Sequence, residues 1–171
     1  MSVFDIEFRY SGGVENSDPG ESFGGAISNF AINVAKPENL FEYIAESSKM
    51  IGATDGATPG TKDYRLFYVK ILPGGSGTGA NGKIWLSAND GISSLSYRLA
   101  VGTKNTSIAK PANQTIMPSM TFQTAPTSQG SGLVLPNIVA GDYVPIGIER
   151  SISATNDLQT NKGPSFTVYW D

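Results

Sequence analysis

Residues 83–101, KIWLSANDGISSLSYRLAV, decide the fold class because two segments in this stretch alternate apolar and polar side chains. A period of two residues is typical of a β-strand with one buried face and one solvated face. The first segment covers residues 83–88 and the second covers residues 92–101. The Asp-Gly pair at residues 90–91 suits the positive φ angles of a tight turn. The sequence therefore predicts a β-hairpin here.

Short alternating segments recur in both directions from this stretch. Near the N-terminus, Phe4, Ile6, Phe8 and Tyr10 alternate with charged residues. About eight such strands at short spacing predict an all-β fold, an antiparallel β-sandwich of the Ig-like or the jelly-roll type. The remaining predicted strands are residues 64–72, 115–123, 133–135, 143–149 and 166–170.

One short helix and one glycine-rich arm are expected beside the strands. Pro37 suits the first position of a helix and Lys49 suits its last turn. The stretch SGGVENSDPGESFGG, which begins at Ser11, has a composition whose backbone entropy opposes regular structure. We therefore expect an N-terminal strand and extended arm over residues 1–36, followed by a single sandwich domain over residues 37–171.

The composition argues against several classes of function. The chain has no His, which is the commonest general base and zinc ligand, so we expect neither enzyme activity nor a bound cofactor or metal. The net charge is -3 and the basic residues are scattered, so we expect no nucleic-acid partner. No apolar run approaches the ~18 residues of a membrane span, and the charged N-terminus does not resemble a signal peptide. Synthesis in a cytoplasm and no membrane partner are therefore expected.

Three patterns that resemble functional motifs are better interpreted as ordinary structure. Residues 77–83, GTGANGK, match much of a phosphate-binding loop, but Ile84 replaces the required Ser or Thr and begins a predicted strand instead of a helix. Asp5 and Glu7 share one wet strand face, so they lack the different environments that acid–base catalysis needs. Four carboxylates near turns follow no EF-hand spacing, namely Asp63, Asp90, Asp142 and Asp157.

Aromatic side chains leave a binding function open as an alternative. Flat rings can stack on sugars, although most aromatic residues of a sandwich fill its core. Strand alternation turns Trp85 and Tyr68 away from the apolar face of their own strands. A carbohydrate-binding or receptor-binding module is therefore the alternative from another class of function. The aromatic residues concerned are Tyr64, Phe67, Tyr68, Trp85, Tyr97, Tyr143, Tyr169 and Trp170.

Several stretches, in this order, resemble a family of small virion structural proteins of tailed bacteriophages. Members of this family open with an Asp-Ile-Glu-Phe-Arg strand, a Ser-Gly-Gly step and an Asn-x-Asp-Pro turn. Two positions depart from the usual pattern: Phe23 stands where an aliphatic residue is common, and Gly147 stands where Trp is common. The stretches are DIEFRYSGGVENSDPGESFGG (residues 5–25), YRLFYVKI (64–71), KIWLSAN (83–89), GLVLPNIVAGDYVPIGIERSISA (132–154) and SFTVYWD (165–171).

The resemblance implies a non-enzymatic structural component of a virion. Its location would be the tail and baseplate region or, as an alternative, the capsid shell, where it would act as a decoration (cement) protein. The implied partners are tail, baseplate or major capsid proteins and further copies of the same chain. The protein would be made in the cytoplasm of the host bacterium and would reside in the virion.

The glycine-rich arm is the expected subunit contact. A segment that is unstable alone can become ordered against a neighbouring subunit, where main-chain hydrogen bonds offset its entropy. The sequence therefore predicts contacts with neighbouring subunits by Ser11, Gly12, Gly13, Asn16, Asp18, Pro19, Phe23, Gly24 and Gly25.

Overall fold

Eight strands and one short 3-10 helix form the regular structure of the computed structural model, which describes residues 5–32, 61–88, 95–152 and 164–171. The strands are β1 (Ile6–Tyr10), β2 (Thr61–Ile71), β3 (Lys83–Ala88), β4 (Leu95–Val101), β5 (Gln123–Thr124), β6 (Leu133–Val134), β7 (Tyr143–Ile152) and β8 (Ser165–Tyr169), and the helix is η1 (Pro19–Glu21). All strand pairs are antiparallel, so the predicted all-β class is confirmed. The helix predicted after Pro37 falls outside the described residues.

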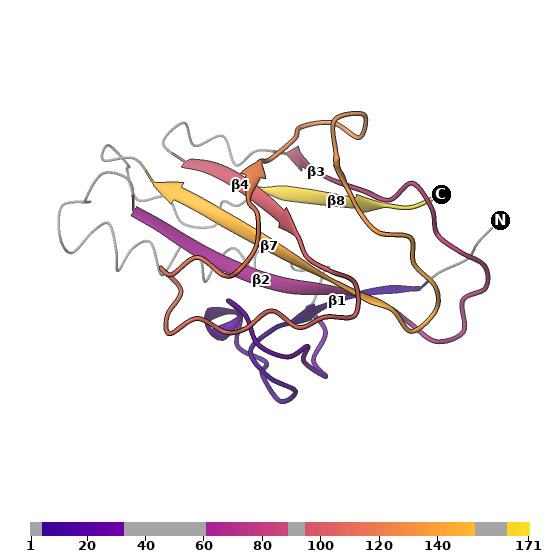
Figure 1. Cartoon of the computed structure of the whole chain (residues 1–171), viewed down its shortest axis with the longest axis horizontal. Coiled ribbons are helices and arrows are strands. Elements are labelled where there is room, and N and C mark those ends of the chain that lie inside the picture. The colour runs from indigo at the N-terminus through magenta and orange to yellow at the C-terminus, as the bar shows by residue number, and fades with distance from the viewer. Residues whose placement is uncertain (1–4, 33–60, 89–94, 153–163) are drawn as a thin grey trace.

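The strands form two sheets (Figure 1). Five strands pair in the order β1-β2-β7-β4-β5, and three pair in the order β6-β3-β8. The long central strands β2 and β7 pair from Thr61 opposite Ile152 to Lys70 opposite Tyr143. Both are rich in β-branched and aromatic residues, which pack well on a pleated surface.

One hydrophobic core joins the two sheets. Alternate residues of β2 and β7 point into it, and so do alternate residues of β3 and β8 from the other sheet. Full burial of each Val, Ile or Phe side chain contributes about 1.5–3 kcal/mol. The buried members are Tyr10, Phe67, Val69, Ile71, Ile84, Leu86, Tyr97, Leu99, Ala125, Leu135, Ile138, Val144, Ile146 and Ile148.

The predicted hairpin between residues 83–88 and 92–101 is wrong. Both strands form, but β3 pairs with β6 and β8, whereas β4 pairs with β5 and β7 in the other sheet. The chain therefore crosses between the sheets instead of turning back along one of them. A period of two residues shows which side chains are buried, but it does not show which strands pair. Ile84 and Leu99 enter the same core from opposite sheets, and their burial fits the pattern as well as a hairpin would.

Two other sequence predictions have different outcomes. The strand predicted over residues 115–123 is mostly wrong, because only Gln123–Thr124 pairs with β4. Pro118 has no N–H to donate to a ladder, and its carbonyl accepts from Met120 in a turn. The interpretation of residues 77–83 as a loop leading into a strand is confirmed, because β3 begins at Lys83.

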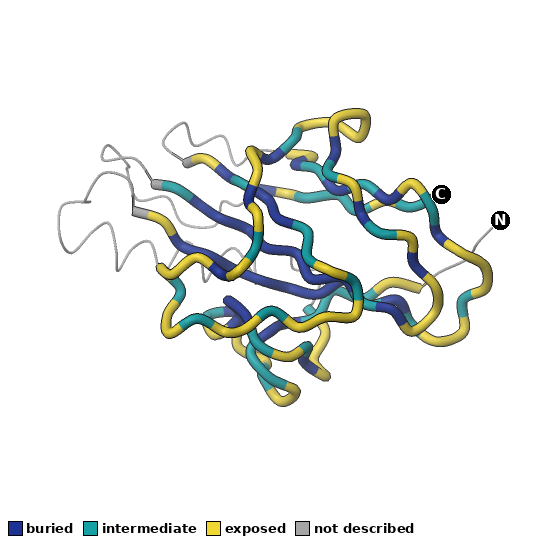
Figure 2. The backbone as a smooth tube through the Cα atoms, in the orientation of Figure 1, coloured by how far each residue is buried: buried dark blue, intermediate teal, exposed yellow. Residues whose placement is uncertain are grey.

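The outer face of the five-stranded sheet is covered rather than solvated. Leu66 and Tyr68 point away from the shared core, yet both are fully buried. Segments from residues 11–32 and 102–122 contact them, and Figure 2 shows β2 and β7 in dark blue along most of their length. The expectation of an extended arm is therefore wrong: the glycine-rich segment folds back onto its own sheet.

Candidate subunit-contact site

The N-terminal lobe, residues 11–32, begins where β1 ends at Tyr10. Beyond this point, the edge of β2 bonds to the lobe. The Leu66 N–H donates to the carbonyl of Ser22 (2.7 Å), and the Leu66 carbonyl accepts from Oγ of Ser11 (2.7 Å). The lobe therefore continues the hydrogen bonding of the sheet edge with a loop carbonyl and a hydroxyl group.

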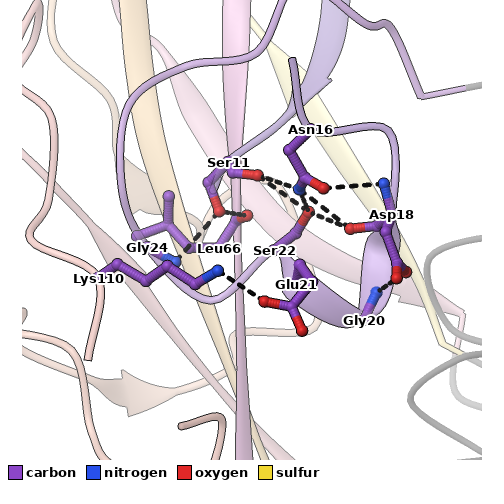
Figure 3. Close-up of polar contacts among 9 residues, drawn as sticks. All are labelled: Ser11, Asn16, Asp18, Gly20, Glu21, Ser22, Gly24, Leu66 and Lys110. Carbon is purple, nitrogen blue, oxygen red and sulfur yellow. Dashed lines mark hydrogen bonds and ion pairs between the residues drawn. The ribbon is translucent and has the colours of Figure 1, made fainter. Parts of the chain in front are cut away.

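The side-chain amide of Asn16 holds the lobe together (Figure 3). Its Nδ2 donates to the carbonyls of Ser11 and Asp18 and lies 3.1 Å from Oγ of Ser22. Its Oδ1 accepts from the N–H of Asp18 (3.0 Å). Asn, unlike Leu or Ala, can make these bonds because its amide both donates and accepts. One side chain thus ties both ends of the 11–22 loop.

The Asp-Pro-Gly sequence of the lobe starts the helix η1. Oδ1 of Asp18 accepts from the N–H of Gly20 (2.7 Å), which is the usual capping bond of an acidic residue before a helix. Pro19 occupies the first helical position, where a missing N–H costs nothing. This short helix is thus held by bonds within the chain.

Two glycines are required by close packing in the lobe. Gly24 has a φ of +147°, and a Cβ there would lie 2.8 Å from backbone atoms of Ala109 and Lys110. Gly12 has a φ of +105°, and a Cβ there would lie 2.8 Å from the carbonyl oxygen of Glu21. Both the dihedral angle and the contact therefore favour glycine.

The lobe also bonds to the segment that follows β4. The N–H of Gly25 donates to the carbonyl of Ile108 (2.7 Å). The hydroxyl of Tyr68, from β2 beneath, donates to the Gly25 carbonyl (2.6 Å) and accepts from the Ile108 N–H (3.3 Å). Burial raises the pKa of Tyr68, so its hydroxyl stays protonated and can donate. The lobe, β2 and the 102–122 segment are thereby joined at one hydroxyl group.

A cation adds to this contact at the surface. Nζ of Lys110 lies 2.7 Å from Oε2 of Glu21 and 4.6 Å from the centre of the Phe23 ring. Phe23 is buried beneath it. Such surface pairs contribute little each, about 0–1 kcal/mol, but this one fixes which segment lies over the ring.

The last residues of the lobe protect the edge of the five-stranded sheet. The N–H of Ser28 donates to the Tyr10 carbonyl (2.9 Å), and the N–H of Ile32 donates to the Phe8 carbonyl (2.6 Å). Exposed strand edges are templates for unwanted pairing with other chains. This part of the lobe therefore blocks pairing at β1.

The structure gathers the nine predicted contact residues into the lobe, but most of their contacts are internal. Ser11, Pro19, Phe23 and Gly24 are buried within the chain, so they cannot be the atoms that meet a neighbour. The Asn16 amide is used by the lobe itself. The other four predicted residues are accessible to solvent: Gly12, Gly13 and Gly25 are partly exposed and Asp18 is exposed.

Sequence reasoning missed the apolar residues that the lobe presents to solvent. Val14 is 54% exposed and Phe30 is 45% exposed. The N–H of Asn29 donates to the Val14 carbonyl (2.8 Å), which brings these two parts of the lobe together. The available signal was a Val and a Phe within a stretch otherwise dominated by small and polar residues. Exposed apolar side chains on an ordered surface are suited to protein contact.

Charged side chains of the outer sheet face form a structural cluster. Glu149, whose side chain is 1% exposed, accepts from Lys62 (3.1 Å), Arg98 (3.2 Å) and the hydroxyl of Tyr64 (3.1 Å). Burial alone would raise the pKa of Glu149, but the bonds from Lys62 and Tyr64 and the charge of Arg98 hold this pKa below its usual value. Burial, together with the Glu149 charge, raises the pKa of Tyr64 to about 12. Glu149 therefore stays ionised and paired.

The other buried carboxylates are also bound to donors of the chain. Asp63 pairs with Arg150, and Asp142 accepts from Lys104 Nζ (2.8 Å), Asn105 Nδ2 (2.6 Å) and the Val139 N–H (2.9 Å). Among the residues that the structure describes, no group of three or more His, Cys, Asp or Glu residues could hold a metal ion. These acids are thus bonded to donors of the fold.

An open groove of about 730 Å³ lies between the end of β4, the approach to β5 and strand β6. Its one ionisable lining residue is Lys104, which is already paired with Asp142. A groove of this kind can hold a chain or a small molecule. Its lining is Val101, Gly102, Thr103, Lys104, Thr121, Gln123, Ser131, Gly132, Leu133, Val134 and Pro136.

Comparisons with known proteins give no relative for this chain: no family model, no curated protein and no solved structure matches it. Within the described ranges, no helix is both long and apolar enough to span a membrane.

Proposed function

We propose that this protein is a non-enzymatic structural component of a tailed-phage virion that packs against neighbouring subunits in the tail and baseplate region. Two kinds of support bear on this proposal. The order of several sequence stretches resembles such proteins, and the buried ionisable groups described above are engaged in holding the fold. We also propose that the two sheets form a β-sandwich of the Ig-like or jelly-roll type, because both sheets contribute alternate side chains to one core.

The single observation that carries the proposal is the N-terminal lobe. It is ordered by its own hydrogen bonds and rests on Leu66 and Tyr68, so little conformational entropy remains to be lost on association. It nevertheless presents Val14 and Phe30 to solvent. An ordered surface with exposed apolar residues is suited to repeated contact with another subunit.

The test is incorporation of surface variants into phage particles. In Val14→Asp and Phe30→Asp, a charge replaces an exposed side chain, so the isolated proteins should melt as the wild type does. We expect each variant to lower the number of copies per purified particle at least tenfold, measured by quantitative mass spectrometry. The matched control is Val134→Asp, because Val134 is 70% exposed on the other sheet.

Three results would overturn the proposal or its location. Absence of the protein from purified wild-type particles would refute a virion role. Normal incorporation of both lobe variants would refute the lobe as the contact. A particle reconstruction decides the location: copies around the tail axis support the tail and baseplate, whereas copies on the icosahedral shell would show a capsid decoration protein instead.

A further inference from the structure

The outer face of the three-stranded sheet is formed by alternate residues of β3 and β8. Lys83 lies opposite Tyr169, and Trp85 lies opposite Thr167. The intervening residues of both strands, such as Ile84 and Val168, belong to the core. Side chains of a strand alternate between faces, so Trp85 and Tyr169 point away from the core. We call this surface the β3–β8 face; it comprises Asn81, Lys83, Trp85, Val134, Ser165, Thr167, Tyr169 and Asp171.

This face is partly solvated, whereas the corresponding face of the other sheet is covered. Tyr169 is 40% exposed and Val134 is 70% exposed, whereas Leu66 and Tyr68 are fully buried beneath the lobe. Trp85 is half-buried. Diagonal neighbours on adjacent antiparallel strands have side chains about 7–8 Å apart, which is within reach of aromatic rings. Trp85 and Tyr169 are therefore diagonal neighbours on this face.

Hydrogen-bonding groups beside these rings are fixed in position. Oδ1 of Asp171 accepts from the Tyr169 hydroxyl (2.5 Å), and Oδ2 accepts from Nδ2 of Asn81 (2.9 Å). Asn81 has a φ of +52°, a conformation that Asn tolerates better than most residues. At the other end, Oγ of Ser87 donates to the Ser165 carbonyl (3.1 Å). The carboxylate–amide pair is thus bonded to the Tyr169 hydroxyl, and the Ser87 hydroxyl lies near the other end of β3.

The charge of the face favours a neutral ligand. Lys83 and Asp171 are its two charged side chains, and they cancel. The Lys83 ammonium group is drawn to one side, because it donates to the Gly132 carbonyl (3.2 Å). A strongly anionic or cationic polymer would find no matching field here.

The size of the face argues against a second copy of the chain as the occupant. The strand β3 has six residues and β8 has five, but β6 has only two, so the face narrows toward β6. Its eight residues are well below the roughly 20–30 residues that each partner contributes to a standard protein interface. A single extended chain of small units fits this area better than a protein does.

We propose that the β3–β8 face binds a neutral oligosaccharide. Sugar rings present flat C–H surfaces that pack on Trp85 and Tyr169, while hydroxyl groups at their edges bond to the carboxylate of Asp171, the amide of Asn81 and the hydroxyl of Thr167. This site is independent of the N-terminal lobe, which lies over the other sheet. The protein would therefore carry an assembly surface and a glycan-binding surface on opposite layers.

The test uses the full chain and a panel of neutral hexasaccharides, namely cellohexaose, maltohexaose, chitohexaose and mannohexaose. Binding is followed by calorimetry and by tryptophan fluorescence. Trp85 is the responsive fluorophore, because Trp170 packs against the core and its Nε1 donates to the Pro136 carbonyl (3.0 Å). We expect at least one member to bind, with affinity lowered at least tenfold in Trp85→Ala and severalfold in Tyr169→Phe, which loses the bond to Asp171.

Matched variants distinguish sugar binding at this face from binding elsewhere on the protein. Phe30→Ala removes an exposed ring of the lobe and should bind sugar as the wild type does, whereas Trp85→Tyr should restore much of the affinity lost in Trp85→Ala. If Trp85→Ala melts early, Thr167→Lys tests the same face without removing a ring. Binding to no member of the panel, or binding unchanged in Trp85→Ala and Thr167→Lys, would overturn the proposal. Dimerisation abolished by Trp85→Ala in sedimentation experiments would also overturn it, because a second copy would then be the occupant.

Discussion

Asp63 and Arg150 lie directly opposite each other on β2 and β7 and form an ion pair inside the protein. Nε of Arg150 lies 2.9 Å from Oδ1 of Asp63. The side chain of Asp63 is 1% exposed and that of Arg150 is 3% exposed. They share the strand face that further along carries Phe67 and Ile146 into the core. Two charges thus stand where alternation alone would place apolar residues.

Removing one partner of this pair should be strongly destabilising. In Asp63→Asn the guanidinium group stays buried but loses its counter-charge, which costs about 3–5 kcal/mol of unfolding free energy. Urea unfolding followed by fluorescence measures this change. The matched control is Glu7→Gln, which breaks the half-buried Glu7–Arg9 pair and should cost no more than about 1 kcal/mol. Equal losses in the two variants would contradict the assigned burial.

The Glu149 cluster should make stability depend on acid pH. The pKa of Glu149 in the folded state is below its usual value of about 4.5, despite the opposing effect of burial, because Lys62, Tyr64 and Arg98 favour the carboxylate. The stabilisation is therefore fully present above about pH 4.5 and is lost as pH falls through the lower, folded-state pKa. Melting temperatures of wild type and Glu149→Gln should differ clearly at pH 6 and converge toward pH 3. A difference of constant size across this range would refute the ionic role.

Gly24 and Gly13 separate two costs of adding a Cβ to the lobe. Both have positive φ angles, +147° and +123°, but a Cβ at Gly24 meets backbone at 2.8 Å, whereas a Cβ at Gly13 has no atom within 4 Å. Gly13→Ala should cost about 1 kcal/mol from backbone strain alone. Gly24→Ala should cost more, about 2–4 kcal/mol, because neighbouring backbone must move. Thermal melting measures both, and a smaller loss in Gly24→Ala would contradict the close approach to residues 109–110.

The sequence predicts the positions of the strands well, but it does not predict which strands pair. Alternation correctly placed β1, β2, β3, β4, β7 and β8, because burial of one sheet face is encoded residue by residue. The pairing of β3 with β8 was not predictable in this way, because it joins segments about 80 residues apart in the chain. The Asp-Gly pair at residues 90–91 instead predicts a hairpin between β3 and β4, but these strands lie in different sheets.

The lobe shows a second limit of sequence reasoning. Its glycine-rich composition was interpreted as an arm that needs another subunit for order. Composition cannot show that Asn16 and Ser11 find their partners within the same chain, because Leu66, Tyr68 and Ile108 come from distant segments. For the same reason the exposed Val14 and Phe30 could not be recognised before the rest of the lobe was placed.

The attachment of the lobe to Leu66 has a mechanical consequence. Both backbone groups of this residue are bonded to the lobe, and its strand is held to β7 by a ladder ten residue pairs long. A pull applied at Val14 is therefore transmitted through the lobe to Leu66 in the middle of β2, as well as to the edge strand β1. External force on the lobe is therefore shared between these bonds to Leu66 and the hydrogen-bonded ladder of β2 and β7.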